Sequence, residues 1–240
     1  MRATFCQMSK STVLVSCTAQ SEENRSALLI AQSFDHGGFE KFAELDMVWD
    51  NATGLSSAYN EKLRKYAATD VEFLVFVHDD VYIDDLKLPD KLNAAHEKLG
   101  YDIVGAAGAV QAKVAEPALW HLMSDRTQHR GFVHHFLNNG QVHCSSFGPT
   151  PSEVVLIDGV FMAVHLPSVV RKGWEFNENY KFHHYDLASC LDAKNKGLKI
   201  GVYPIHIIHE SPGLDSFSNP SWRESNQRFL AEYGPGGHHA

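Results

Sequence analysis

The segment Glu72-Phe73-Leu74-Val75-Phe76-Val77-His78-Asp79-Asp80 is the most informative part of this chain. Its apolar, β-branched and aromatic run predicts a buried strand over 72–77, which stops at two adjacent carboxylates. Strand periodicity places His78 and Asp80 on one side and Asp79 on the other. Carboxylates beside an apolar layer are costly without a partner, which favours a bound cation or nucleotide. A solvated turn that begins at Asp79 is the other interpretation, and the tripeptide alone favours neither.

The segments on either side of this strand alternate between strand and helix patterns. Strands are predicted over 12–17, 42–49, 103–106, 154–164 and 198–203, and helices over 21–33 (N-cap Ser21), 54–68, 88–99 and 186–196. This alternation predicts an α/β fold with a mostly parallel, nucleotide-binding sheet flanked by helices. The loops after the first three strands should meet at one sheet edge. Residues 111–152 show no clear period, and we expect a long, partly irregular excursion with a functional role.

Length and composition indicate one large globular domain. The chain has 240 residues, of which 44% are hydrophobic and 21% charged, and its formal net charge is −8. That charge argues against a nucleic-acid partner, and it means that an anionic ligand would need a local cation. No apolar stretch reaches the ~18 residues of a membrane span, so no transmembrane segment is expected. The cysteines are far apart, which predicts reduced thiols and a cytoplasmic location; they are Cys6, Cys17, Cys144 and Cys190.

Two further positions could carry chemistry. Asp186, at the start of a predicted helix, could be a general base, although an acidic residue that complements the helix dipole is the commoner role. His209, after the last predicted strand, could complete a metal site that begins at Asp80, or it could simply pack beside the sheet.

Two other features are ambiguous from the residues alone. Asp158-Gly159 interrupts a predicted strand, where the glycine would allow close approach of a substrate or backbone, or would mark a bulge. Trp174 could stack on a sugar, although closing the edge of the core is the commoner fate of such a residue.

In this order, these pieces resemble the family 2 glycosyltransferases of the GT-A fold, and among them the bacterial capsule or surface-polysaccharide type. The resemblance covers roughly residues 12–213. It rests on Trp49-Asp50-Asn51, Gly54-Leu55-Ser56, Ala58-Tyr59-Asn60, the 73–81 segment, the 157–163 segment, the 174–178 segment, His184-Tyr185-Asp186 and the 209–213 segment.

The resemblance implies a role for each matching residue. Thr18, Asp50 and Asn51 would hold the base and ribose, Asn60 would border the donor, and His78-Asp79-Asp80 corresponds to the DxD motif. Asp80, joined by His209, would bind Mn²⁺ or Mg²⁺, and Asp186 would be the catalytic base. Asp158, Gly159 and Trp174 would contact the acceptor. Two positions depart from the family pattern: His78 replaces the first Asp of DxD, and Tyr185 replaces the Glu that usually precedes the base.

The implied function is an inverting, metal-dependent transfer of a sugar from a nucleotide-sugar, with UDP weakly favoured, to a hydroxyl of a saccharide or lipid-linked saccharide. The domain would span 1–233, with a nucleotide-sugar half (12–110), an acceptor and catalytic half (111–213) and a disordered tail (234–240). A nucleotidyltransferase is disfavoured, because the 18–23 segment has neither glycine nor a cation. A metal-dependent hydrolase and a non-catalytic sugar-nucleotide- or carbohydrate-binding module remain alternatives.

Overall fold

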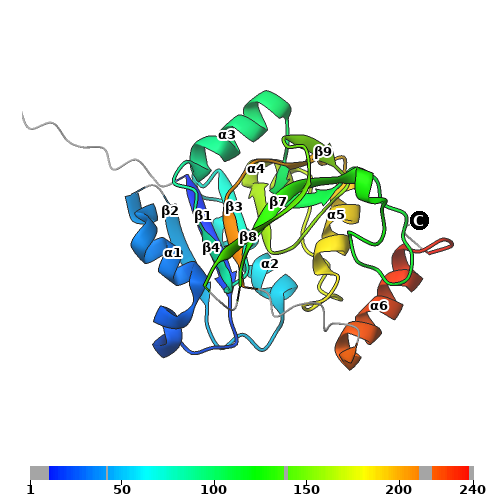
Figure 1. Cartoon of the computed structure of the whole chain (residues 1–240), viewed down its shortest axis with the longest axis horizontal. Coiled ribbons are helices and arrows are strands. Elements are labelled where there is room, and N and C mark those ends of the chain that lie inside the picture. Colours follow the sequence, from blue (N-terminus) through cyan, green and yellow to red (C-terminus); the bar gives the residue numbers. More distant parts are fainter. Residues whose placement is uncertain (1–10, 42, 138–139, 211–217, 238–240) are drawn as a thin grey trace, which may run out of the picture.

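The computed structural model describes residues 11–41, 43–137, 140–210 and 218–237, and its core is a mixed seven-stranded sheet in the order β2-β1-β3-β11-β5-β12-β9 (Figure 1). The strands are β1 (Thr12–Cys17), β2 (Ala43–Val48), β3 (Phe73–Val77), β5 (Ile103–Gly105), β9 (Ser152–Val154), β11 (Phe161–His165) and β12 (Ile200–Val202). The predicted parallel pairs form between β1, β2 and β3. In the centre, however, β11 runs antiparallel to both β3 and β5. Parallel and antiparallel pairs are therefore more evenly represented in this sheet than in the mostly parallel sheet that the sequence predicted.

A second sheet packs beside the first and has the order β10-β6-β7-β13-β4, with β8 paired to β7. Its strands are β4 (Val81–Ile83), β6 (Ala107–Ala109), β7 (His129–Phe136), β8 (Val142–Gly148), β10 (Leu156–Ile157) and β13 (Ile207–His209). The predicted long, partly irregular excursion over 111–152 is irregular mainly in its first half, whereas β7 and β8 form a long hairpin in its second half. Burial alternates along β7, but its buried positions include His129 and Gly131 instead of aliphatic residues alone. The sequence therefore lacks the alternating apolar pattern that would have predicted this strand.

Helices cover the main sheet and one end of the molecule (Figure 1). They are α1 (Leu29–Gly37), α2 (Leu55–Tyr66), α3 (Leu88–Leu99), α4 (Leu166–Arg171), α5 (Tyr185–Asn195) and α6 (Pro220–Tyr233), with short 3-10 helices η1 (Glu22–Ala27), η2 (Phe39–Lys41) and η3 (Arg126–Gln128). The helix predicted over 21–33 is split: Leu28 is extended, with φ −81° and ψ 130°, and the Ser21 side chain makes no capping bond. This break allows Ile30 to enter the core while its N–H bonds to the carbonyl of Asp79.

The first two strand ends meet as predicted. Thr18 N donates to Val48 O at 2.9 Å, and Asn51 N donates to Thr18 O at 2.9 Å, so the loops after β1 and β2 are held together by backbone bonds. In the part of the chain that the structure describes, Cys17, Cys144 and Cys190 are free thiols. None of the described helices is long and apolar enough to cross a membrane. Residues 234–237 form a turn after α6, whereas Cys6, residues 211–213 of the last motif and residues 238–240 lie outside the described ranges.

Candidate active site

Three side chains that are candidate cation ligands meet where β3 and β13 end. His78, Asp80 and His209 each offer one ligand atom, and these atoms lie within 4.8 Å of one another. These residues meet because the chain turns at Asp79-Asp80 and continues into β4, which begins at Val81. Strand β4 pairs antiparallel with β13, and this pairing places His209 opposite Val81. His209 Nε2 then lies 3.3 Å from Asp80 Oδ2. The expected grouping of His78 and Asp80 on one side of the strand end is consistent with this geometry.

The polar groups in this cluster fit a divalent cation. Asp80 Oδ1 is buried and has no hydrogen-bond partner within the described ranges, which is a costly state for a carboxylate oxygen. Burial alone would raise the pKa of Asp80, but the hydrogen bond and charge of His209 outweigh it and hold the pKa below its usual value. Burial lowers the pKa of His78 and favours the neutral imidazole that a metal requires. A carboxylate oxygen with two imidazoles suits Mn²⁺ better than Mg²⁺, because Mg²⁺ prefers oxygen ligands alone.

A second cluster with similar composition, His96, Asp102 and His165, differs in its surroundings. The two imidazole rings stack with centroids 3.6 Å apart. His165 Nδ1 lies 2.9 Å from the hydroxyl of Ser168, and Arg171 donates to that same hydroxyl at 3.3 Å. A permanent positive charge therefore already lies beside the cluster and opposes a further cation. The first cluster is therefore the better candidate for a cation site.

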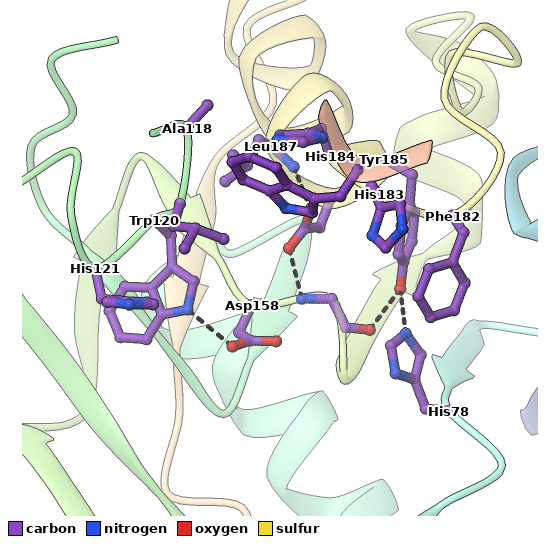
Figure 2. Close-up of a pocket in the computed structure, with 14 residues that line it drawn as sticks. His78, Ala118, Trp120, His121, Asp158, Phe182, His183, His184, Tyr185 and Leu187 are labelled. Atoms are coloured by element: carbon purple, nitrogen blue, oxygen red, sulfur yellow. Dashed lines mark hydrogen bonds between the residues drawn. The ribbon is translucent and has the colours of Figure 1, made fainter. Parts of the chain in front are cut away.

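A cavity of about 230 Å³ opens next to His78 and contains the remaining candidate groups. Its lining includes the polar group Asp158, Gly159, Tyr185 and Asp186 and the aromatic residues Trp120, Phe182 and Trp222. The Asp186 carboxylate accepts the backbone N–H of Gly159, and the Tyr185 hydroxyl contacts both Gly159 O and His78 Nε2. Figure 2 shows Tyr185 and His78 joined by this contact. The predicted base and part of the predicted acceptor site therefore share one cavity with a predicted donor residue.

Asp186 has the surroundings of a general base. It lies in the first turn of α5, and its two oxygens accept the backbone N–H groups of Gly159, at 3.1 Å, and Leu187, at 2.9 Å. Burial, followed by the nearby charge of Asp158, raises its pKa to about 7. A carboxylate with a pKa near neutrality can take a proton from a hydroxyl more effectively than an ordinary aspartate.

Asp158 and Gly159 are positioned by their neighbours. Asp158 Oδ2 accepts the indole N–H of Trp120 at 2.8 Å, and its Oδ1 accepts Val160 N–H at 3.1 Å (Figure 2). A Cβ at Gly159 would lie 2.6 Å from the Tyr185 hydroxyl and 2.9 Å from Asp186 Cβ. Of the options that the sequence left open, the structure shows close approach by α5 as a reason for the glycine.

Two predicted site residues lie in the interior instead. Asn60 is 1% exposed; its amide donates to Phe176 O at 2.9 Å, and its carbonyl accepts Phe176 N–H at 2.8 Å. Trp174 is 2% exposed and donates to Ser189 O at 3.0 Å. Neither lines the cavity: Trp174 has the core-edge position that the sequence left open, and the donor role of Asn60 and the acceptor role of Trp174 stay predictions. Both fix the loop before α5.

The other predicted donor residues lie at the strand ends. The Thr18 hydroxyl is buried and accepts Gln20 N–H at 3.1 Å, whereas Asp50 is exposed in the left-handed region with φ 49°. Asn51 Oδ1 accepts Thr53 N–H at 3.0 Å in a local turn. Asp79 follows β3 and accepts Ile30 N–H through its carbonyl. These residues stay predicted donor contacts at one sheet edge.

Sequence reasoning missed several residues of the cavity. The contact between His78 and Tyr185 joins positions 107 residues apart, and no local pattern could indicate it. Phe182 is 55% exposed and lies with its ring stacked on His78, with centroids 5.9 Å apart. Its only signal in the sequence is an aromatic residue placed beside a histidine pair. Trp120 and Trp222 come from the excursion and from α6, two segments without a predicted structure.

The chain was compared with known proteins. A family model described as "Glycosyltransferase like family" matches residues 41–233, so the chain belongs to this family. No curated protein matches the chain in sequence. The family resemblance and the glycosyltransferase class predicted from the motifs are therefore confirmed.

Solved structures share the fold at low identity. A197 from STIV has a TM-score of 0.51 and 12% identity, covering 83% of this chain and 85% of that one. TarS of S. aureus has a TM-score of 0.52 and 14% identity, covering 93% of this chain but 39% of that one. TarS 1–349 in complex with UDP has a TM-score of 0.50 and 13% identity, covering 92% of this chain and 64% of that one. These likenesses confirm the α/β architecture, and the chain spans less than two thirds of either TarS structure.

Proposed function

We propose that this glycosyltransferase is an inverting, metal-dependent enzyme that moves a sugar from a nucleotide-sugar to a hydroxyl of a saccharide acceptor. One observation carries the proposal: a carboxylate with a pKa of about 7 lines a cavity whose wall also includes His78, a member of the His78–Asp80–His209 cluster. Transfer of a glycosyl group needs a base for the acceptor and charge neutralisation for the departing diphosphate, and the cavity and the adjoining cluster together offer both.

The chemistry follows from the positions of these groups. Asp186 accepts the proton of the acceptor hydroxyl, whose oxygen forms a bond to the anomeric carbon. The bond from that carbon to the nucleotide diphosphate breaks at the same time, and the electron pair leaves with the diphosphate. A divalent cation on Asp80 and His209 would supply Lewis-acid neutralisation of that charge. A single displacement without a covalent intermediate inverts the anomeric configuration.

The donor half of the proposal assigns Thr18, Asp50, Asn51 and Asp79 to the nucleotide-sugar. They belong to the 12–110 segment, and the bonds between the β1 and β2 loops support a preformed edge there. A uridine nucleotide is the favoured donor, supported by the structural neighbour that was solved with UDP. The 111–213 segment, which carries Asp158 and Asp186, supplies the acceptor and catalytic half.

The acceptor half rests on the chemistry of the cavity wall. Among the residues that line it in the described part of the chain, none is lysine or arginine, while Asp158 and Asp186 are both acidic. The exposed ring of Phe182 offers an apolar face for a sugar. These features support a neutral saccharide, free or lipid-linked, as in surface-polysaccharide synthesis. The free thiols support a cytoplasmic location.

The test is a turnover assay with purified protein, Mn²⁺, a panel of UDP-sugars and neutral oligosaccharide acceptors. We expect UDP release that depends on the acceptor and a product whose anomeric configuration, read by NMR coupling constants, is opposite to that of the donor. Retention of configuration would contradict the single displacement. Binding of the donor without turnover, across the panel, would indicate a binding module, and phosphate release from simple esters would indicate a hydrolase.

A further inference from the structure

The hydroxyl of Tyr185 connects the base-bearing helix to the cation cluster. It donates to the carbonyl oxygen of Gly159 at 2.6 Å and lies 3.0 Å from His78 Nε2 (Figure 2). Tyr185 is 3% exposed, so these contacts are shielded from water. One bond joins the start of α5 to the turn before β11, and the other joins it to the residue that follows β3.

A count of protons fixes the direction of both bonds. A carbonyl oxygen can only accept, so the single hydroxyl proton of Tyr185 must point at Gly159 O. The bond to His78 then requires a proton on Nε2, which donates to the Tyr185 oxygen. A neutral imidazole carries one proton, so the lone pair of His78 is on Nδ1.

We propose that Tyr185 is a positioning residue that holds His78 in the Nε2–H tautomer and thereby leaves Nδ1 as the nitrogen that binds a divalent cation. The proposal rests on the proposed function only in taking His78, Asp80 and His209 as one cation site. Histidines that bind metals generally donate their other ring N–H to a fixed acceptor, and here the tyrosine oxygen is that acceptor.

The surrounding atoms support this assignment. Asp80 Oδ1, the buried oxygen without a described partner, belongs to the same cluster as His78 and is available to the same cation. Gly159 also donates its N–H to Asp186 Oδ2 at 3.1 Å. One residue, Gly159, therefore holds the base through its N–H and the residue that orients His78 through its carbonyl oxygen. This relates the tyrosine before Asp186 to the histidine before Asp79-Asp80.

The first experiment reads the tautomer in the metal-free protein. Ring-¹⁵N-histidine NMR at pH 8, where an ordinary imidazole (pKa ~6.5) is neutral, reports which nitrogen carries the proton. The His78 signals are assigned by their loss in His78→Gln. We expect a protonated Nε2 and an unprotonated Nδ1. The Nδ1–H tautomer in the parent protein would overturn the proposal, and this measurement requires neither turnover nor a stable Tyr185 variant.

The second experiment measures Mn²⁺ affinity by calorimetry, with the metal alone, in the parent, Tyr185→Phe and Tyr180→Phe. Tyr180 is a matched control, because it is 0% exposed and its hydroxyl donates to Glu232 at 2.7 Å outside the cavity. Loss of a partner that orients a metal ligand costs about 10–100-fold in affinity, so we expect that loss for Tyr185→Phe alone.

The outcomes separate this inference from the proposed function. A folded Tyr185→Phe protein with parental Mn²⁺ affinity overturns the inference, as does an equal loss in Tyr180→Phe. A parent that binds no Mn²⁺ overturns both the inference and metal dependence. Binding that weakens only in Tyr185→Phe, in a parent that transfers no sugar, supports the inference and contradicts the proposed function.

Discussion

The carboxylate of Asp186 combines two properties that are usually separate in proteins. It accepts two backbone N–H groups, which favour the ionised form, yet burial and Asp158 together prevail and raise its pKa to about 7. The ionised carboxylate therefore becomes the major form only as the pH rises through about 7. The same side chain must then affect the rate and the stability of the protein in opposite directions as the pH rises.

The effect on rate is tested by Asp186→Asn. The amide keeps the size of the side chain but cannot accept the acceptor's proton, so we expect transfer to fall by about 10²–10⁴-fold. UDP binding should be nearly unchanged. The parent's kcat/KM should rise with pH through about 7, the pKa of Asp186, and the residual rate of the variant should lack this rise. A variant that transfers sugar at the parent rate would show that another group is the base.

The effect on stability has a sign that follows from proton linkage. The pKa of Asp186 is about 7 in the folded protein against an ordinary 3.8, so between these values the folded state binds more protons than the unfolded state. The parent should therefore lose stability from this group as the pH rises through that window, with the full penalty above about pH 7. The asparagine of the variant does not titrate, and its lost backbone bond costs the same at every pH.

We accordingly expect the melting temperature of Asp186→Asn, minus that of the parent, to become more positive between pH 5 and pH 8, by a few degrees. Differential scanning fluorimetry across this range gives the difference directly. A difference that stays constant with pH would mean that the folded-state pKa of Asp186 is not raised.

At the level of elements, the contact between α2 and the loop before α5 involves Asn60, for which the family resemblance implied a donor contact. Asn60 closes two bonds with the backbone of Phe176, and Ser57 on the same helix donates to Glu178 at 3.0 Å near the surface. Asn60→Ala leaves two buried backbone groups unpaired, so we expect a loss of about 2–4 kcal/mol in unfolding free energy.

Urea unfolding tests the role of Asn60, with Ser57→Ala as the control; removal of a surface hydrogen bond should change stability by less than about 0.5 kcal/mol. The dissociation constant for UDP with Mn²⁺ should stay within about twofold in both variants, since the buried Asn60 side chain is already paired with the backbone of Phe176 and Ser57 lies outside the proposed donor residues. An Asn60→Ala protein with parental stability and much weaker UDP binding would indicate that Asn60 contacts the donor.

The approach of α5 to the 158–160 turn gives the second prediction at this scale. In Gly159→Ala the added carbon would contact Tyr185 and Asp186 at under 3.0 Å, and the start of α5 must move. We expect a loss of about 1–3 kcal/mol in stability, together with most of the transfer activity. Gly140→Ala is the control, because its Cβ meets nothing within 4 Å and only the left-handed backbone, at φ +78°, opposes it. Chemical denaturation and the transfer assay should separate the two variants; equal activity in both would contradict the tight approach.

The elements that sequence analysis predicted well are those with a complete local signal. The prediction over 88–99 matches α3, where the apolar period ends at Gly100 in the left-handed conformation. By contrast, α6 buries Asn226 in its inward row, where it accepts Ala118 N–H at 2.9 Å, and the polar residue interrupts the apolar pattern. Strand β7 similarly faces inward with a histidine and a glycine.

The candidate site residues likewise fall into those with a local sequence signal and those whose surroundings depend on distant partners. Asp80 and His209 could be proposed because each directly follows or ends a strand, where ligands of such sheets gather. The burial of Asn60 and Trp174 could not be predicted, because their partners lie more than ten positions away and determine whether the side chain is exposed or buried. The bond between Tyr185 and His78, over 107 positions, belongs to the tertiary fold alone.

At the scale of the whole molecule, a net charge of −8 opposes an anionic nucleotide unless a cation is bound with it. The cluster of His78, Asp80 and His209 is where such a cation would couple to the ligand. Coupling between two ligands is reciprocal, so Mn²⁺ should tighten UDP binding by the factor by which UDP tightens Mn²⁺ binding.

We expect that factor to be at least about tenfold, equivalent to about 1.4 kcal/mol. Calorimetric titrations of UDP in Mn²⁺ and in EDTA give this coupling factor. Titrations of Mn²⁺ with and without UDP give it a second time, independently, and the two values should agree. Asp80→Ala should abolish the coupling, whereas Asp102→Ala, in the second histidine cluster, should retain it, because that cluster already lies beside Arg171. UDP that binds equally well in EDTA and in Mn²⁺ would show that the acidic protein neutralises the diphosphate with its own side chains and would remove the cation from the proposed chemistry.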